Sequence, residues 1–257
     1  ASVSGRGLDP SRWRQRPYRS PHHTASAVAL VGGGADPRPG EISLSHNGVL
    51  FLDELPEWDR KALEVLREPL ESGTVTVSRA ARSSEFPARF QLVAAMNPCP
   101  CGWAGDPSGR CRCSPEHIRR YRAKISGPLM DRIDLHIEVP RLPPQELRPD
   151  APNGEATVFI RARVEQARTV QLQRTGKANA QLGQAETMAF CRLQDRDQAL
   201  LERAIERLQL SARSMHRILR VARTIADLAG AEDIATPHLT EALGYRRMDR
   251  GQGQQAA

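Results

Sequence analysis

Two adjacent carboxylates, Asp53 and Glu54, stand directly after the apolar run of residues 49–52. Carboxylates at the end of a buried strand are costly to desolvate, so their position favours a bound ligand. The aspartate can order Mg²⁺ and its waters on a nucleotide phosphate, because Mg²⁺ takes oxygen ligands and keeps several waters. The glutamate can polarise the attacking water in phosphoryl transfer. A strand followed by a solvated turn gives the same short pattern and remains the alternative interpretation.

Four of the five cysteines, Cys99, Cys101, Cys111 and Cys113, fall within residues 99–113. In a chain without a secretory signal, four thiols so close together favour tetrahedral Zn²⁺. The spacing is C-x-C rather than C-x-x-C, a tighter chelate, so free thiols and then disulfides remain as alternatives. The fifth, Cys191, is expected to be a small core residue.

Two other features invite interpretation. The pair His22–His23 suggests a metal site, but adjacent residues of a strand or helix do not share a face, so we favour a role outside metal binding. The basic run IRRYRAK, residues 118–124, predicts an exposed helix at a subunit or DNA interface.

The elements that must position these residues follow from apolar spacing and turn signals. Leucines 63, 66 and 70 recur at helical spacing, and a serine followed by proline opens a later helix. The predicted elements are strands over 49–53, 91–96 and 133–139, a helix over 59–72, a β-hairpin over 74–90 and a helix starting at 114.

A proline-rich stretch, residues 140–155, breaks the pattern and predicts a domain boundary. Beyond it the chain is expected to be helical, over 155–175, 195–208, 212–229 and 236–246. We therefore predict an α/β core over 1–145, a helical domain over 146–248 and a disordered tail over 249–257.

The composition is that of a globular chain, with 39% hydrophobic residues and a mean hydropathy of -0.51. No apolar run approaches the roughly 20 residues of a membrane span, and the N-terminal segment lacks the apolar core of a signal peptide. These features predict a cytoplasmic location. A net charge of +7 and a pI near 9.6 permit a polyanionic partner.

Longer strings carry a resemblance. Three stretches of the chain resemble the magnesium-chelatase-like AAA+ ATPases. They are YRSPHHTASAVALVGGGADPRPGEISLSHNGVLFLDELPEW, the cysteine-containing string that runs on to GPLMDRIDLHIEVP, and SARSMHRILRVARTIADL. Among these they are most similar to the ComM group of bacterial competence proteins. The resemblance covers nearly the whole chain. It implies a partial AAA+ P-loop NTPase core, a parallel sheet with helices and a β-hairpin insertion, followed by an all-α lid.

The resemblance also implies roles for single residues. Asp53 matches the Walker B aspartate that acts through Mg²⁺, and Glu54 matches the catalytic glutamate. Asn97, at the end of LVAAMNP, matches sensor 1. Arg132 matches an arginine finger that reaches a neighbouring subunit, and Arg213 matches sensor 2; alone, either arginine could serve a surface or capping role.

The hairpin resembles the pre-sensor-1 insertion of this AAA+ branch, which often lines a central pore. Its tip carries Arg79 and Arg82. In a ring these arginines would track a nucleic-acid backbone, whereas a solvated loop is the alternative.

The sequence departs from the family at the phosphate-binding loop. The motif G-x-x-x-x-G-K-[ST] is missing, and the Gly176-Lys177 pair is far downstream and followed by alanine. The resemblance places the P-loop just upstream of residue 1. The chain is then expected to be the C-terminal part of an ATPase that by itself binds ATP weakly and hydrolyses it poorly.

The resemblance implies that the intact protein is a homo-oligomeric ring, a hexamer in the family's pattern, that hydrolyses ATP and moves on DNA during branch migration of transforming DNA. One alternative is a chelatase motor subunit acting on a protein partner. Another is a non-enzymatic module that binds zinc and nucleic acid.

Overall fold

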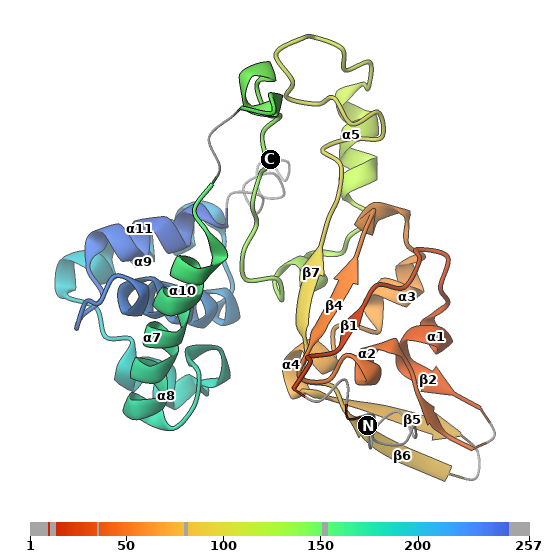
Figure 1. Ribbon diagram of the computed structural model, residues 1–257, viewed down its shortest axis with the longest axis horizontal. Coiled ribbons are helices and arrows are strands. Elements are labelled where there is room, and N and C mark those ends of the chain that lie inside the picture. The colour runs from red at the N-terminus through yellow and green to blue at the C-terminus, as the bar shows by residue number, and fades with distance from the viewer. Residues whose placement is uncertain (1–9, 11–13, 35, 80–81, 151–153, 247–257) are drawn as a thin grey trace. The chain divides into compact units, whose positions relative to one another are not determined.

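The computed structural model describes residues 10, 14–34, 36–79, 82–150 and 154–246. The chain forms two compact units, which divide between Ile133 and Asp134 (Figure 1). The first unit is α/β and the second is helical, as predicted for a partial AAA+ core followed by an all-α lid. Among the described residues, no helix combines the length and apolar character needed to cross a membrane.

A parallel three-stranded sheet organises the first unit. Its order is β1 (Tyr18–Arg19), β4 (Val49–Leu52), β7 (Gln91–Ala94), so β4 is central (Figure 1). Leu50 and Leu52 of β4 are fully buried, and Leu52 is in register with Ala94. The strands predicted over 49–53 and 91–96 are confirmed as β4 and β7, although each is shorter than expected.

Gly48 explains how β4 comes so close to the chain before β1. A side-chain carbon at this position would lie 2.0 Å from the carbonyl oxygen of Pro17. The next residue, Val49, donates its backbone N–H to that same oxygen at 2.8 Å. Only glycine allows this approach, which starts the central strand in its place.

Short elements lie between β1 and β4. Ser26 caps α1 (Ala27–Val31) by accepting from the backbone N–H of Ala29 at 3.2 Å. An antiparallel pair, β2 (Gly32–Gly33) and β3 (Arg38–Pro39), leads into α2 (Glu41–Leu44).

The predicted helix over 59–72 is wrong as a single element. Asp59 caps α3 (Arg60–Glu64) through its carboxylate, but the helix then gives way to turns before α4 (Pro69–Ser72). Proline at 69 lacks the N–H that a continuous helix would need there, and its ring crowds the preceding turn. The leucine spacing survives the break, because Leu63 and Leu66 are both buried.

The predicted hairpin is confirmed as β5 (Thr74–Arg79) and β6 (Arg82–Pro87), in register from Thr74 with Pro87 to Arg79 with Arg82. Val75 and Val77 are buried in the core, so apolar and polar residues alternate along β5 as they do in a strand with one buried face.

The segment after β7 runs through the cysteine region to α5 (Pro115–Arg122) and α6 (Gly127–Met130). Ser114 caps α5 by accepting from the backbone N–H of His117 at 3.2 Å, as its sequence signal predicted.

The strand predicted over 133–139 is wrong. These residues are irregular, and Leu135, Ile137 and Val139 are exposed by 46%, 65% and 86%. A strand needs a partner for its backbone N–H and C=O groups. Within the described residues no strand pairs with this segment or with the outer edge of β7, and His136 instead donates its backbone N–H to the carbonyl of Tyr245 at 2.9 Å.

The second unit is a helical bundle that follows a short 3₁₀ turn at Pro144–Leu147. Its helices are α7 (Thr157–Thr175), α8 (Gln184–Phe190), α9 (Asp195–Leu208), α10 (Ala212–Leu228) and α11 (Thr236–Gly244), with a 3₁₀ turn at Asn179–Gln181. Four of these were predicted. The short α8 was missed, although Glu186 accepts from the backbone N–H of Gly183 at 2.7 Å and so marks its start.

Leucine, isoleucine and alanine side chains from α9, α10 and α11 form the core of the bundle, including Leu201, Ile218, Ala222 and Leu239. Cys191 is 2% exposed and belongs to this core, as predicted. The tail predicted to be disordered lies outside the described residues.

A charged network is also buried in the bundle. The Asp227 carboxylate, with no exposed side-chain surface, accepts from Arg223 at 3.0 Å, from Asn179 at 2.8 Å and from Arg174. This network joins α7, α10 and the turn between α7 and α8.

Candidate functional site

The ends of β4 and β7 bring the predicted Walker B and sensor 1 residues to one edge of the sheet. Beyond the strands the chains stay paired: Ala95 donates its N–H to the carbonyl of Leu52, and Leu55 donates to the carbonyl of Ala95, both at 2.9 Å. Asp53 and Glu54 lie between these two bonds, and Asn97 follows two residues after Ala95. All three side chains are exposed.

The turn at the carboxylates has an unusual backbone. Glu54 adopts φ 49° and ψ 46°, a left-handed conformation uncommon for a residue with a side chain. Its N–H donates to Asp53 Oδ1 at 2.8 Å, and the buried Trp58 donates its indole N–H to the Asp53 carbonyl at 2.9 Å. These bonds hold the turn, so both carboxylates project from the strand end.

A histidine joins this turn. His23 Nδ1 lies 3.1 Å from Glu54 Oε2, with side chains that are 30% and 52% exposed. His22 packs its ring against His23, with centroids 4.1 Å apart, and its Nδ1 lies 3.0 Å from Thr24 Oγ1. Sequence reasoning missed this partner of Glu54, because the contact joins segments far apart in the chain.

Asn97 is anchored from its C-terminal side. Arg122 of α5 donates its Nε–H to the carbonyl of Pro98 at 3.2 Å. Burial raises the pKa of the Tyr121 phenol. A hydrogen bond from the Asn97 backbone acts in the opposite direction and lowers this pKa. Helix α5 therefore contacts the backbone of Asn97 through Tyr121 and the carbonyl of Pro98 through Arg122.

Arg132, two residues after α6, has a nearly buried side chain. Its guanidinium donates to Glu71 Oε2 at 2.5 Å and to the carbonyl of Pro128 at 2.7 Å, and its side chain is 8% exposed. The arrangement ties Arg132 to the end of α4 within its own chain. Arg213 belongs to the second unit, in the first turn of α10 after the N-cap Ser211.

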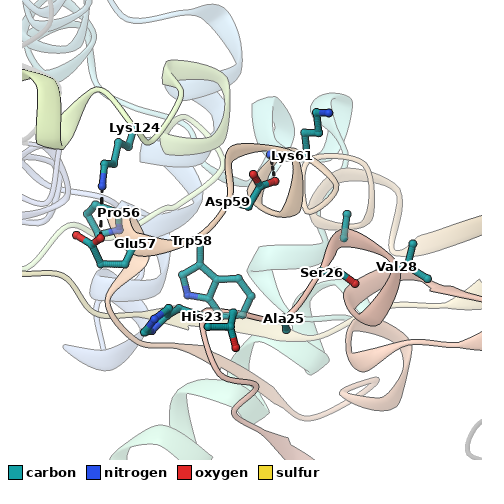
Figure 2. A pocket seen from close by; sticks show the side chains of 12 residues that line it. His23, Ala25, Ser26, Val28, Pro56, Glu57, Trp58, Asp59, Lys61 and Lys124 are labelled. Carbon is teal, nitrogen blue, oxygen red and sulfur yellow. Dashed lines mark hydrogen bonds and ion pairs between the residues drawn. The ribbon is translucent and has the colours of Figure 1, made fainter.

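An open cleft of about 630 Å³ lies beside the carboxylate turn (Figure 2). Its walls come from the segment around α1, the turn after β4 and the segment after α5. Figure 2 shows Lys124 reaching Glu57 across one end, with Nζ 3.4 Å from Oε2. His23 and Trp58 line the cleft, so the side chain that contacts Glu54 also faces this space.

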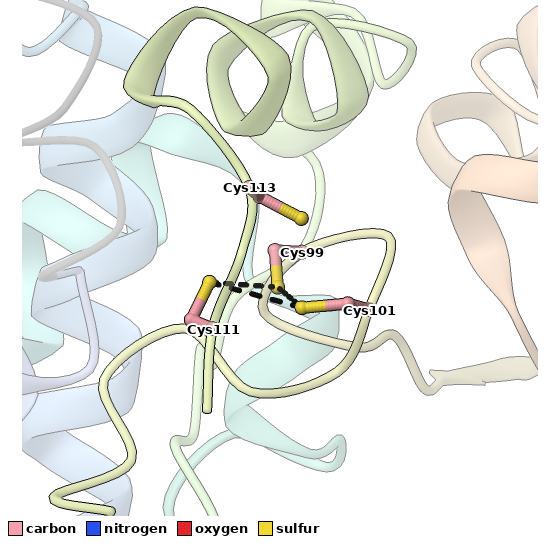
Figure 3. Close-up of side chains that lie close together, drawn as sticks. All are labelled: Cys99, Cys101, Cys111 and Cys113. Atoms are coloured by element: carbon pink, nitrogen blue, oxygen red, sulfur yellow. Dashed lines mark hydrogen bonds between the residues drawn. The ribbon is translucent and has the colours of Figure 1, made fainter. Parts of the chain in front are cut away.

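The four clustered cysteines converge on one point (Figure 3). Their sulfurs all lie within 4.8 Å of one another, and all are free thiols. The closest pairs are separated by 3.4–3.8 Å, well beyond the S–S bond of about 2.05 Å, so the disulfide alternative is not realised. Backbone hydrogen bonds from Trp103 and Arg112 lower the pKa of Cys101 to about 6, which favours a thiolate.

The hairpin arginines are placed only by their backbone. Arg79 ends β5 and Arg82 opens β6, beside a Ser78–Ser83 contact at 3.0 Å between hydroxyl oxygens. The side chains of these arginines, and residues 80–81, lie outside what the structure describes.

Comparison with known families agrees with this architecture. Residues 1–147 match the family model of magnesium chelatase subunit ChlI, and residues 154–246 match the model of the ChlI C-terminal region. The chain belongs to the magnesium chelatase ChlI family. The first ChlI segment contains the β4–β7 edge and the cysteine cluster, and the second contains the helical bundle.

The chain is also similar to individual proteins, at different levels of sequence identity. Competence protein ComM of Haemophilus influenzae is 55% identical over 244 residues, covering 95% of this chain and 47% of ComM. The uncharacterised protein YifB of Escherichia coli is 51% identical, covering 93% of this chain and 47% of YifB. The ChlI subunit of Porphyra purpurea is 28% identical over 120 residues, covering 47% of this chain and 28% of that subunit.

The chain thus spans about half the length of these two bacterial relatives, 47% of each.

Proposed function

We propose that this chain supplies the Walker B, sensor and lid parts of an ATP-driven motor. The supporting observation is the edge formed by β4 and β7, where two exposed carboxylates and an amide project from paired strand ends in a ChlI-family chain. Such an edge of a parallel sheet is where α/β proteins bind ligands.

Asp53 and Glu54 fit a magnesium–nucleotide site. Asp53 Oδ1 accepts one backbone N–H, and its exposed carboxylate keeps a further oxygen for an ion or its water shell. Bound Mg²⁺ would neutralise charge on the phosphates. Glu54 takes the role of orienting and polarising the attacking water, and Asn97 that of placing this water relative to the phosphate.

The arginines complete the proposal. Arg132 acts as the finger on the nucleotide of a neighbouring subunit, which requires a homo-oligomer, and the proposed form is a ring of hexamer type. Its bond to Glu71 then has to open, or Glu71 has to move with it. Arg213 of the lid serves as sensor 2. The proposed cofactors are ATP and Mg²⁺, with structural Zn²⁺ on the cysteine cluster, and the proposed location is the cytoplasm.

The test of hydrolysis uses the full-length protein. We expect Glu54→Gln to lower kcat about 10²- to 10⁴-fold, the usual contribution of a positioned acid or base, while nucleotide still binds. The matched control is Glu57→Gln, a nearby exposed carboxylate paired with Lys124. Equal activity of Glu54→Gln and the parent protein would refute the assignment.

The substrate proposed for the motor is DNA, in ATP-driven branch migration during natural transformation. The net charge of +7, the hairpin and the similarity to a competence protein support it. The alternative, favoured by the ChlI family match, is a chelatase motor that acts on a protein partner. ATPase activity stimulated by DNA distinguishes the two, since a chelatase motor should not respond.

The hairpin gives a second test in the same protein. If Arg79 and Arg82 contact phosphates, replacing both by alanine should weaken DNA binding and flatten its salt dependence by about one to two units of log–log slope. The control is Arg60→Ala, an exposed arginine of α3. An unchanged slope would remove the hairpin from the DNA path, and tight DNA binding without any ATPase would favour a non-enzymatic binding module.

A further inference from the structure

The cysteine cluster has the geometry of a four-thiolate metal site. A tetrahedral Zn²⁺ with Zn–S bonds of about 2.3 Å separates its sulfurs by about 3.8 Å. The observed separations are 3.4 Å for Cys99 with Cys101, 3.8 Å for Cys99 with Cys111 and 3.7 Å for Cys101 with Cys111. Cys113, just before α5, completes the group within 4.8 Å.

The backbone around Cys99 is folded as a ligand-bearing turn. Cys99 is fully buried, and its sulfur accepts the backbone N–H of Ala104 at 3.3 Å. Gly102 donates its N–H to the Cys99 carbonyl at 3.0 Å and adopts φ 79°, a conformation that glycine reaches without strain. Hydrogen bonds that orient metal ligands in this way are a regular part of metal sites.

The same turn adjoins Asn97. An ideal side-chain carbon built on Gly102 would lie 4.0 Å from the amide oxygen of Asn97, and Cys99 follows Asn97 by only two residues. Pro98, between them, is held by Arg122 of α5. The first cysteine, the sensor residue and α5 are therefore parts of one small packed region.

The loop from β7 to α5 has no regular structure over residues 95–114. Loops of this length without secondary structure lose much conformational entropy when they are fixed. A metal ion that clips both ends of the loop reduces that loss. The cysteine pairs occupy the two ends: Cys99 and Cys101 next to β7, Cys111 and Cys113 next to α5.

We propose that Cys99, Cys101, Cys111 and Cys113 bind one Zn²⁺, and that this ion fixes the backbone that presents Asn97 to the Asp53–Glu54 edge. The metal site stands on the sulfur geometry alone. Its coupling to Asn97 rests on the proposed ATPase function. The cysteines are then positioning residues for the motor and take no part in the chemistry.

Zinc content tests the metal site without reference to activity. Full-length protein purified without chelators should carry one zinc per chain at the cluster, and Co²⁺ exchanged into it should show thiolate charge-transfer bands. Cys101→Ser, which removes the exposed ligand, should weaken zinc retention at least tenfold. The control Cys191→Ala should not change the stoichiometry. Zinc-free protein with four freely titrating cluster thiols would overturn the site.

The coupling is tested by combining variants in the ATPase assay. Cys101→Ser should lower kcat at least fivefold with little change in KM for ATP. It should have little further effect in an Asn97→Ala background, because the two act through one residue. Fully additive losses, or full activity of zinc-depleted folded protein, would overturn the coupling. If Glu54→Gln and Asn97→Ala keep full ATPase activity, the proposed function fails, while the zinc measurement still decides the metal site.

Discussion

His23 Nδ1 and Glu54 Oε2 lie 3.1 Å apart, which ties the segment after β1 to the carboxylate turn after β4. The contact limits where the Glu54 carboxylate can point. Glu54 is the residue proposed to orient the attacking water, so His23 becomes a positioning residue for that water. His23 also lines the cleft together with Trp58, so Glu54 contacts a residue of the cleft wall.

Replacing His23 should therefore lower turnover without weakening nucleotide binding. Misplacing a catalytic group by about 1 Å can cost on the order of 10²-fold, so we expect His23→Ala to reduce kcat about 10- to 100-fold. KM for ATP should change little, because His23 contacts the carboxylate rather than a proposed phosphate ligand.

His22→Ala is the matched control for this prediction. It removes the ring that packs on His23, while the described polar partner of His22 is Thr24. Equal losses in the two variants would mean that the pair acts through general packing and would contradict a specific role of His23.

Arg132 gives a prediction about subunit contacts. An arginine finger contributes about 10³- to 10⁵-fold to phosphoryl transfer, so Arg132→Ala should nearly abolish ATPase activity of the full-length protein. In mixtures with Glu54→Gln subunits, part of the activity should return at mixed interfaces, since each variant supplies what the other lacks.

Glu71→Gln separates this role from a structural one. It removes the charge that holds Arg132 within its own chain but keeps the side-chain shape. If Arg132 acts on a neighbouring subunit, Glu71→Gln should retain most activity, whereas loss as deep as that of Arg132→Ala would indicate that the ion pair itself is required.

Asp227 should be essential for the stability of the helical unit. Its carboxylate has no exposed surface and accepts from Arg174, Asn179 and Arg223. Removing one partner of a buried ion pair leaves charge uncompensated and costs about 3–5 kcal/mol. We expect Asp227→Ala to lower the free energy of unfolding by this amount in urea titrations, and the exposed Asp233→Ala to change it by less than about 0.5 kcal/mol.

The buried thiol of Cys191 should make the folded protein less stable at alkaline pH. Burial raises the pKa of its thiol to about 11 from the ordinary value of 9.0. Below pH 9 the thiol is neutral in both states, so its contribution to stability is fully present. Between pH 9 and 11 the unfolded chain ionises while the folded one resists, so the free energy of unfolding falls as pH rises.

The measurement compares urea unfolding of the parent protein and Cys191→Ala at pH 8 and pH 10.5. Other groups titrate in this range in both proteins, so the difference between the two pH dependences isolates Cys191. The variant should lose less stability on the shift to high pH, and parallel losses would contradict the burial effect.

Sequence patterns predicted the elements whose signals are local. Val75 and Val77 alternate with polar neighbours in the hairpin, and Ser114 with the following proline marks the start of α5. Failures occurred where distant contacts or single residues override periodicity. Pro69 breaks a helix whose leucine spacing continues across the break, and residues 133–139 alternate without a described strand to pair with.

The candidate site was predictable in its chemistry but not in its contacts. Adjacent carboxylates and clustered thiols are visible as residue types, and parallel strand ends explain why Asp53 and Asn97 share an edge. No local pattern indicates that His23 meets Glu54, or that Glu71 holds Arg132. Such pairings depend on how the chain folds back, so periodicity carries no signal for them.

The left-handed backbone at Glu54 has a consequence for selection. A residue with a side chain pays about 1–3 kcal/mol to hold such a conformation, which glycine adopts freely and asparagine tolerates well. A library randomised at this position and screened only for folding should therefore drift to glycine or asparagine. A library screened for motor output should keep glutamate, so the two screens would pull one codon in opposite directions.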